Sequence, residues 1–390
     1  MVLARGWRLG KPLFAGAAYI FNFLREWARV GGMLTLVPFS TLALPRHLAL
    51  MLGLAMFSAI IVRLMVFIGV PDRPDARKAH HRTTPKSGGV GIVAAFMLGV
   101  LLLYRYGAVS RLPEGYFLGV IAASLLIALV SFIDDLLNLS FWIKLLTQLI
   151  AGGAAVSSGL YVHGLALPGV GLVALGGLGV PLTLLFLLFI TNAMNFIDGL
   201  NGLSSGVTLV ACLFLAGIAG LEGGFFVYTA SLLLAGGVLG FLPFNFPRAQ
   251  IFMGDVGSQF CGFLLALFGV AAARFEAVPL SFLLVPFLLS GVLYDVTFTL
   301  IRRALAGENI AHAHNGHLYQ IAARCGVDPR FVALLHWGFA ALGGVSAVLF
   351  LLLPPSVRPA IMLLPLAVQL VWTSKVIRLA HEARLGRWSV

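Results

Sequence analysis

The sequence predicts an all-α integral membrane protein that crosses the bilayer many times. Of its 390 residues, 60% are hydrophobic and only 10% are charged, whereas a soluble domain carries about 25% charged residues. Its apolar runs are about 20 residues long, the length that an α-helix needs to cross a bilayer. They are continuous rather than alternating, which argues against a transmembrane β-barrel.

Eleven apolar segments are candidate membrane-spanning helices. In chain order they cover residues 48–70, 89–106, 115–133, 139–158, 172–191, 203–220, 225–244, 257–273, 278–300, 329–353 and 357–377. They form one multi-span domain over residues 48–380, followed by a basic tail at 381–390. Residues 1–47 are basic and amphipathic, and three interpretations stay open for them: an interfacial helix, an additional span, or a true start near Met51.

Basic residues are distributed unequally between the two sets of loops. If the spans alternate in direction, the loops on one face contain only Arg111 and Arg274. The opposite face contains Arg73, Arg77, Lys78, Arg82, Lys86, Arg248, Arg302, Arg303, Arg324, Arg378, Arg384 and Arg387. Because cytoplasmic loops are enriched in Lys and Arg, the second face is predicted to be cytoplasmic. The formal net charge of +12 therefore reflects topology and an anionic substrate, and it does not require a nucleic acid.

Two polar segments before the fifth span lie on the predicted cytoplasmic face. Residues 77–91 (RKAHHRTTPKSGGVG) combine a basic loop with glycines at a helix start, where Lys86 and backbone N–H groups suit a phosphate. Asp134 and Asp135 end a span as adjacent carboxylates, which repel one another unless a cation or a proton relieves them. Lys144 follows at about the same depth. The structural alternatives are a basic turn and a solvated helix end.

A third polar segment follows the fifth span. Asn195, Asp198 and Asn201 recur every three residues after Asn192, so a helical continuation would align them on one face. Amide and carboxylate groups together can read the donor–acceptor edge of a base or a sugar. A C-cap with a turn is the structural alternative.

Asp255 stands between Gly254 and Gly257 at the start of the eighth span. It either caps that helix or contributes a hard oxygen ligand to Mg²⁺, which needs only one or two protein carboxylates together with substrate phosphates.

Three histidines, His312, His314 and His317, cluster between the ninth and tenth spans. No cysteine lies nearby, so imidazoles facing a diphosphate are favoured over a zinc site. Asp295, inside the ninth span, is a further carboxylate in a costly position.

The five polar segments predict a catalytic site that opens to the cytosol and the bilayer. A transporter of anionic solutes is the alternative, but transporters more often hold their charges near the midplane in broken helices. A membrane phosphotransferase of the CDP-alcohol type is disfavoured, because its DGxxAR-type motif does not occur in the sequence.

At these residues the chain resembles the polyprenyl-phosphate N-acetylhexosamine-1-phosphate transferases, glycosyltransferase family 4. The motifs occur in the order found in that family and cover about residues 48–380. They are Arg77-Lys78-x-His80 with Thr84-Pro85-x-x-Gly88-Gly89, Asp134-Asp135, Asn192-x-x-Asn195-x-x-Asp198-Gly199-x-Asn201-Gly202, Phe252-x-Gly254-Asp255-x-Gly257-Ser258 and the His segment.

The resemblance implies a reaction at the cytoplasmic face of a bacterial inner membrane. A sugar-1-phosphate passes from a UDP-N-acetylhexosamine to polyprenyl (undecaprenyl) phosphate, and UMP is released. The resemblance implies Mg²⁺, with Mn²⁺ as a substitute, and places the metal on Asp255. It leaves the oligomeric state open, with a homodimer as one option.

The resemblance also suggests roles for the remaining residues. Asp134, Asp135 and Asp198 are expected to be catalytic, and one of the first two would deprotonate the lipid phosphate or act as a covalent nucleophile. Single and double displacement both stay open. Contacts to the substrates are expected from Lys86, Lys144, Asn192, Asn195, Asn201, His312, His314 and His317.

The His segment bears on the donor sugar. AHAHNGHLYQ, residues 311–320, is similar to the AHRSHLYQ pattern of O-antigen-initiating members that use UDP-N-acetyl-fucosamine or UDP-N-acetyl-quinovosamine. Asn315 and Gly316 stand where those members carry Arg and Ser. The three consecutive histidines of the branch that makes lipid I are absent. We therefore expect a 6-deoxy donor sugar and a product that initiates a surface glycan such as O-antigen.

Overall fold

The computed structural model describes residues 43–69, 71–72, 84–106, 114–167, 171–275, 282–309, 315–354 and 356–385. The chain divides into two units, Met1–Pro45 and Arg46–Val390, and the description below concerns the second. The interpretations of residues 1–47 thus fall almost entirely outside the described residues.

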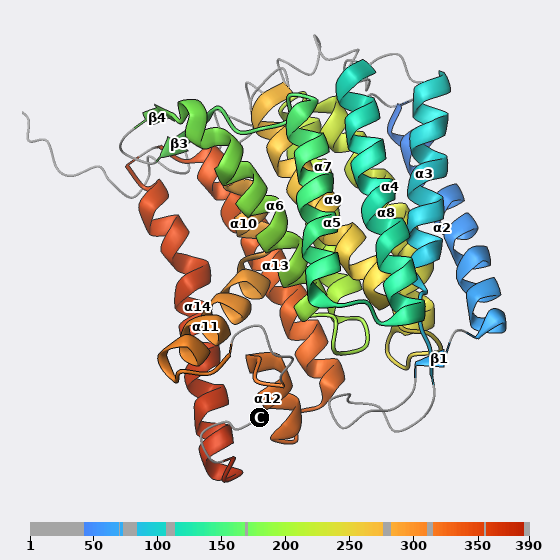
Figure 1. The fold of residues 1–390 in the computed structure, drawn as a ribbon. Helices are drawn as coiled ribbons and strands as arrows, with labels where there is room; N and C mark the ends of the chain where they lie inside the picture. The colour runs from blue at the N-terminus through green and yellow to red at the C-terminus, as the bar shows by residue number, and fades with distance from the viewer. Residues whose placement is uncertain are drawn as a thin grey trace, which may run out of the picture. The chain divides into compact units, whose positions relative to one another are not determined.

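The second unit is built from α-helices (Figure 1). They are α2 (Ala43–Ile68), α3 (Gly89–Tyr106), α4 (Glu114–Leu137), α5 (Phe141–Ser157), α6 (Gly179–Phe196), α7 (Leu203–Leu221), α8 (Phe225–Asn245), α9 (Gly254–Phe275), α10 (Leu284–Leu288), α11 (Ser290–Leu305), α12 (Leu318–Arg324), α13 (Pro329–Leu352) and α14 (Arg358–Glu382). Among the described residues, eight helices are long and apolar enough to cross a membrane, and α3 and α5 are shorter apolar helices. The predicted α-helical, multi-pass membrane fold is confirmed, and the count of eleven spans stays a prediction.

Two features differ from the expected uniform helices. The described part of the expected span at 278–300 contains two helices, α10 and α11, separated at Leu289, whose backbone has φ −101° and ψ 15°. Outside the spans, β1 (Pro71–Asp72) pairs with β2 (Thr84–Pro85), and β3 (Gly164–Leu167) pairs with β4 (Gly171–Ala174), both antiparallel. The β3–β4 hairpin lies in the connection between α5 and α6.

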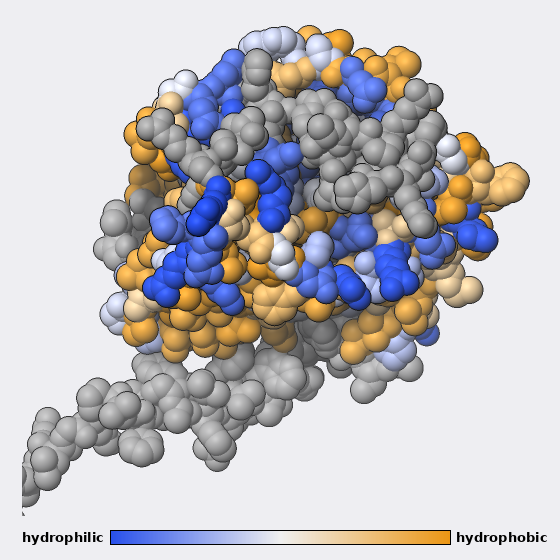
Figure 2. All heavy atoms as spheres, turned by 90° about the horizontal axis from the view of Figure 1, so that it is seen from below, coloured by the Kyte–Doolittle hydropathy of each residue, from blue (hydrophilic) through white to orange (hydrophobic). Residues whose placement is uncertain are grey.

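Helix α9 is the centre of the packing. Nearly all of its spanning residues are buried, and α3, α4, α6, α7 and α8 all contact it. The outer helices α2 and α14 expose apolar side chains such as Met56 and Val371, which a membrane protein turns toward lipid. Hydrophilic residues gather on the face seen from below, with hydrophobic residues around them (Figure 2). The N-terminal end of the central helix, with Asp255, belongs to this end of the bundle.

Two glycines bring α3 and α9 into backbone contact. A Cβ placed on Gly89 would overlap the backbone of Gly257. The N–H groups of Gly88 and Gly89 donate to the carbonyl oxygens of Phe252 (2.9 Å) and Met253 (2.8 Å). The expectation that these N–H groups serve a phosphate is therefore wrong, because they hold the turn that leads into Asp255.

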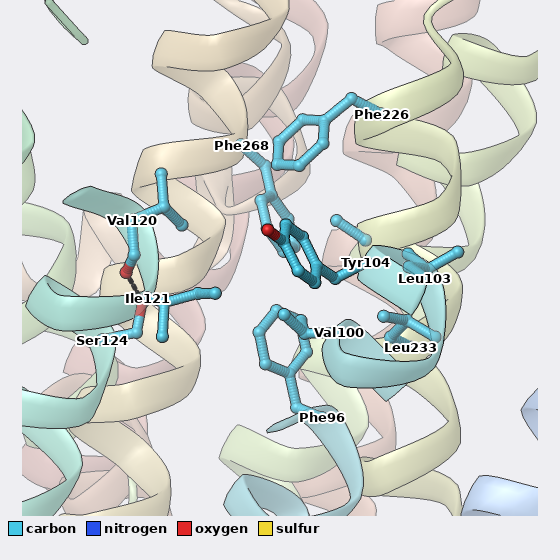
Figure 3. A pocket seen from close by; sticks show the side chains of 11 residues that line it. Phe96, Val100, Leu103, Tyr104, Val120, Ile121, Ser124, Phe226, Leu233 and Phe268 are labelled. Atoms are coloured by element: carbon cyan, nitrogen blue, oxygen red, sulfur yellow. Dashed lines mark hydrogen bonds between the residues drawn. The ribbon is translucent and has the colours of Figure 1, made fainter. Parts of the chain in front are cut away.

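A small apolar cavity of about 30 Å³ lies between α3, α4, α8 and α9. Figure 3 shows the rings of Phe96, Tyr104, Phe226 and Phe268 around it. Tyr104, Phe226 and Phe268 lie in the halves of their helices farther from the polar end, and Phe96 lies near the middle of α3. An apolar void of this kind stays dry, so we interpret it as a packing defect.

The contact between Gly89 and Gly257 generates a stability prediction. Gly89→Ala forces α3 away from α9, and overpacking of this kind costs about 1–3 kcal/mol. Gly153 on α5 is the matched control, because a Cβ there meets no atom within 4 Å. Gly153→Ala should be neutral or stabilising by up to about 1 kcal/mol. Thermal unfolding of the detergent-solubilised protein measures both, and equal midpoints for the two variants would contradict the proposed contact.

Candidate active site

A cavity of about 690 Å³ opens at the polar end of the bundle. It brings together four carboxylates, those of Asp134, Asp135, Asp198 and Asp255, and we call it the carboxylate cavity. The other residues that line it are Lys86, Asn138, Leu139, Lys144, Asn195, Gly199, Leu200, Asn201, Asn245, Phe252, Met253, Gly254, Asn315, Gln320, Ala323, Arg324 and Pro329. The polar segments therefore meet at one place, as the sequence predicted. They lie before α3, after α4, after α6, before α9 and at α12.

Lys144 links two of the carboxylates. Its Nζ donates to Asp134 Oδ2 at 3.0 Å and to Asp255 Oδ2 at 3.1 Å. Helix α5 turns back directly after α4, so Lys144 in its first turns lies beside the last turn of α4. The other oxygen of Asp134, Oδ1, accepts the N–H of Leu139 at 2.6 Å. Both oxygens of Asp134 are thus occupied by donors.

Asp135 holds the N-terminus of α9. Its Oδ1 accepts a hydrogen bond from the backbone N–H of Asp255 at 2.9 Å. Its Oδ2 accepts one from the backbone N–H of Val256 at 3.5 Å and one from the hydroxyl of Ser87 at 3.0 Å. A carboxylate at this position satisfies N–H groups that have no partner within the helix. Asp135 thus fulfils the capping role that was the alternative interpretation of Asp255.

The carboxylate of Asp255 points into the cavity instead. Its Oδ1 accepts the amide of Asn195 at 3.0 Å, and its Oδ2 accepts that of Gln259 at 3.2 Å in addition to Lys144. About a quarter of the side chain, 27%, is exposed. The hydrogen bonds therefore fix the orientation of the Asp255 carboxylate, and one side of it stays open to the cavity.

The donor set of the cavity fits a hard divalent cation better than a softer metal. Four carboxylates line it, but within the described residues no group of three His, Cys, Asp or Glu side chains forms a ready-made metal cage. Mg²⁺ usually binds through one or two carboxylates, substrate phosphates and water. Asp255 fits this pattern, because it combines a fixed carboxylate with an open side.

Asn192 does not line the cavity and is connected to it through Gln148 and Gln259. It exchanges hydrogen bonds with Gln148 (2.6 and 3.3 Å), and Gln148 donates to Gln259 at 2.9 Å, which in turn contacts Asp255. This chain of amides holds the carboxylate of Asp255 through Gln259. Asn192 is absent from the cavity lining, so its expected contact with substrate stays a prediction.

Asp198 differs from the other three carboxylates. It follows the C-terminus of α6, and no residue that the structure describes donates a hydrogen bond to its side chain. Burial, reinforced by the negative charges of Asp255 and Asp135, raises its pKa well above the usual value of 3.8. Because no described group donates to it, Asp198 is the carboxylate whose oxygens are available to a reactant. Asn201 lines the cavity beside it.

Asn245 fixes the loop that carries Asp198 and Asn201. Its Oδ1 accepts the N–H of Gly202 at 2.6 Å, and its Nδ2 donates to the carbonyl of Ile251 at 3.0 Å. Gly202 has φ 75°, a left-handed conformation that glycine adopts without strain. The loops before α7 and before α9 are thus joined across the cavity wall.

Helix α12 contributes Gln320 and Arg324 to the cavity lining, and Asn315 precedes the helix and also lines the cavity. Asp295 of α11 accepts the N–H groups of Leu318 (3.0 Å) and Tyr319 (3.1 Å) and contacts His317 Nδ1 (3.1 Å). The costly carboxylate noted in the sequence therefore caps α12.

His317 is buried in this contact and is absent from the cavity lining. The structure thus shows it positioning α12, and its expected contact with substrate stays a prediction. His312, His314 and the Arg77-Lys78-x-His80 motif lie outside the described residues.

Sequence reasoning missed several amide side chains of the site, among them Gln148, Gln259 and Asn245. Two of them carry a periodicity signal, because Gln148 and Gln259 each follow a site residue, Lys144 and Asp255, by four positions on the same helix face. Asn245 carries no such signal, since its partners come from two loops.

The comparisons with known proteins agree with this site. Residues 117–273 match the family model described as Glycosyl transferase family 4, and this segment contains all four carboxylates of the cavity. The chain is 30% identical to a probable undecaprenyl-phosphate N-acetylglucosaminyl 1-phosphate transferase of Bacillus subtilis (strain 168), over 76% of this chain and 82% of that protein.

Two further relatives point the same way. A decaprenyl-phosphate N-acetylglucosaminephosphotransferase of Mycobacterium tuberculosis (strain ATCC 25618 / H37Rv) is 33% identical over 73% of this chain and 77% of its own length. A phospho-N-acetylmuramoyl-pentapeptide-transferase of Streptococcus thermophilus (strain CNRZ 1066) is 30% identical over 48% of this chain and 58% of its own length. The chain, a multi-pass membrane protein with a carboxylate-lined cavity, belongs to glycosyl transferase family 4.

Proposed function

We propose that the chain transfers a sugar-1-phosphate from a UDP-N-acetylhexosamine to polyprenyl phosphate, releasing UMP and initiating a lipid-linked surface glycan such as O-antigen. One observation carries the proposal: a single cavity at the end of a membrane helix bundle gathers four carboxylates and two lysines. The names of the Bacillus and Mycobacterium relatives, which describe transfer to undecaprenyl and decaprenyl phosphate, support it.

The chemistry joins two anions, so charge neutralisation is its main requirement. The lipid phosphate attacks the β-phosphorus of the UDP-sugar, a phosphorus–oxygen bond forms, and the bond to UMP breaks. Lys86 and Lys144 line the cavity and supply positive charge to the phosphates. Mg²⁺, held by Asp255, would neutralise further charge that develops on the phosphate oxygens.

The geometry separates the roles of the acidic residues. Asp134 and Asp135 already accept hydrogen bonds on both oxygens, so we assign them to holding Lys144 and α9. Asp198, with free oxygens, is assigned to the reactants, where it accepts a hydrogen bond or a proton. Because the second pKa of a phosphate is near 6, positioning contributes more than base strength, and a single displacement is favoured.

The environment of the site follows from the loop charges. We infer a bacterial inner membrane protein whose cavity faces the cytoplasm, where UDP-sugars are available, since the described basic residues Lys86 and Arg324 line it and cytoplasmic loops are enriched in Lys and Arg. The cavity also lies at the end of the spans rather than midway along them. This position argues for the transferase and against the alternative of a transporter for anionic solutes.

A donor panel tests the reaction and the sugar together. Purified protein in lipid, polyprenyl phosphate, Mg²⁺ and radiolabelled UDP-N-acetylhexosamines should yield a lipid-linked product and UMP. From the 311–320 segment we expect a 6-deoxy sugar to be preferred by up to about 100-fold, the scale at which an apolar pocket rejects an added hydroxyl. Equal or better use of UDP-N-acetylglucosamine, the sugar in the names of several relatives, would refute the 6-deoxy preference, and no lipid-linked product from any donor would refute the reaction.

Asp255→Asn tests the metal assignment. Asparagine preserves the shape and can still pair with Asn195 and Lys144, so the protein should fold. A neutral amide is a poorer ligand for a hard dication, and turnover should fall by about 10²–10⁴-fold, each 1.36 kcal/mol being tenfold. A raised Mn²⁺ concentration should restore part of the lost turnover. Near-normal turnover in a well-folded variant would remove Asp255 from the metal site.

Asp198→Asn should lower activity while raising stability. Loss of a positioned proton acceptor costs about 10²–10⁴-fold in rate. The wild-type carboxyl titrates near 3.8 when unfolded and well above that when folded, so the folded state retains its proton longer and wild-type stability falls as pH rises through this window. The Tm advantage of the variant should therefore grow from about pH 4 upward. An advantage independent of pH, or a fully active variant, would contradict the assignment.

A further inference from the structure

Lys144 occupies a position between two carboxylates that a cation of higher charge could also use. Its ammonium contacts Asp134 Oδ2 and Asp255 Oδ2 at nearly equal distances, 3.0 and 3.1 Å. The side chain is about a quarter exposed, at 26%. It is therefore reachable from the cavity and not enclosed in the core.

The remaining contacts of Asp255 come from neutral groups. Asn195 donates to Oδ1, and Gln259 shares Oδ2 with Lys144. Among the described residues Lys144 is thus the only cation paired with this carboxylate. Lys86 lines the same cavity but forms no ion pair with a described carboxylate.

Two cations beside one carboxylate oxygen repel each other strongly. At a separation of about 4 Å the repulsion amounts to several kcal/mol at the effective dielectric of a protein surface. A dication that binds Asp255 must therefore weaken or displace the contact with Lys144. The displaced ammonium stays in the cavity, and an arriving diphosphate offers it new oxygens.

We propose that Lys144 is an exchangeable counter-ion, which competes with the divalent cation for Asp255 and is released to the diphosphate of the donor as the metal binds. The inference rests on the proposed function, because it assumes a metal at Asp255. It gives Lys144 two positions, one on the carboxylates without metal and one on the substrate with it. Metal and donor then strengthen each other's binding, since a coupling between two ligands is reciprocal.

The competition predicts opposite changes in two affinities. Lys144→Met removes the competitor, so the protein without substrate should bind Mn²⁺ more tightly, by about tenfold on the usual scale of such couplings. The same variant should bind the UDP-sugar more weakly and should show a smaller increase of Mn²⁺ affinity when the donor is added. A merely structural role for Lys144 would weaken both affinities together.

The experiment uses the full chain in lipid nanodiscs, with free Mn²⁺ measured by electron paramagnetic resonance and Mg²⁺ added as the competitor. Lys86→Met is the matched control, because it removes the same charge from the same cavity without removing an ion pair to Asp255. It should tighten Mn²⁺ binding by clearly less than Lys144→Met. Lys144→Arg keeps the charge and should not tighten it. Lys144→Gln, which keeps a hydrogen-bond donor, replaces Lys144→Met if that variant does not fold.

The outcomes separate this inference from the function on which it rests. Mn²⁺ binding to Lys144→Met that is no tighter than to the wild type, or tightened only as much as in Lys86→Met, overturns the exchange and leaves the metal assignment standing. If the wild type and all lysine variants bind no Mn²⁺, with or without UDP-sugar, the metal assignment and the exchange both fail.

Discussion

The site depends on the contact between Asp135 and the N-terminus of α9. Through Asp135 and Ser87, α4 and the segment before α3 are joined to the first turn of the central helix. Because α9 packs against most of the bundle, this contact fixes where its first turn lies in the membrane. Asp255 belongs to that turn, so its carboxylate acquires a defined place relative to Asp134 and Lys144. Without this contact the acidic residues would share one end of the bundle but no common geometry.

Gathering four carboxylates in one cavity is electrostatically costly, and the surrounding groups offset the cost unevenly. Backbone N–H groups and a serine hydroxyl stabilise Asp135, Lys144 stabilises Asp134 and Asp255, and amides complete the contacts of Asp255. Asp198 receives no such compensation from the described residues. In an enzyme, a group left in an unfavourable state at a site is commonly the one that meets the substrate. The hydrogen bonds of Asp134, Asp135 and Asp255 therefore hold the structure of the site together, whereas Asp198 is left available for the substrate.

The residues of the site divide by how visible they are in the sequence. Asp134, Asp135, Asp198 and Asp255 are conspicuous, because carboxylates at the ends of apolar spans are costly and therefore need an explanation. Lys86, Lys144, Asn195 and Asn201 were also expected, and the structure places all of them at the cavity. Gln148 and Asn245 are ordinary polar residues in the sequence, and their roles appear only when helices distant in the chain meet. His317 was expected at the substrate, whereas its described contact is with Asp295.

By itself, the sequence determined the membrane class, most helices, the common end at which the polar segments lie and the residue types of the site. These properties follow from hydropathy and from the energetic cost of charge near lipid, which act on each segment separately. Only the tertiary structure decided that Asp135 caps α9, that Lys144 joins two carboxylates and that Asp198 keeps its oxygens free. These roles depend on distances of about 3 Å, the length of a hydrogen bond, between residues up to 121 positions apart in the chain. No local pattern encodes such distances, because the packing of α3, α4, α5, α6 and α9 sets them jointly.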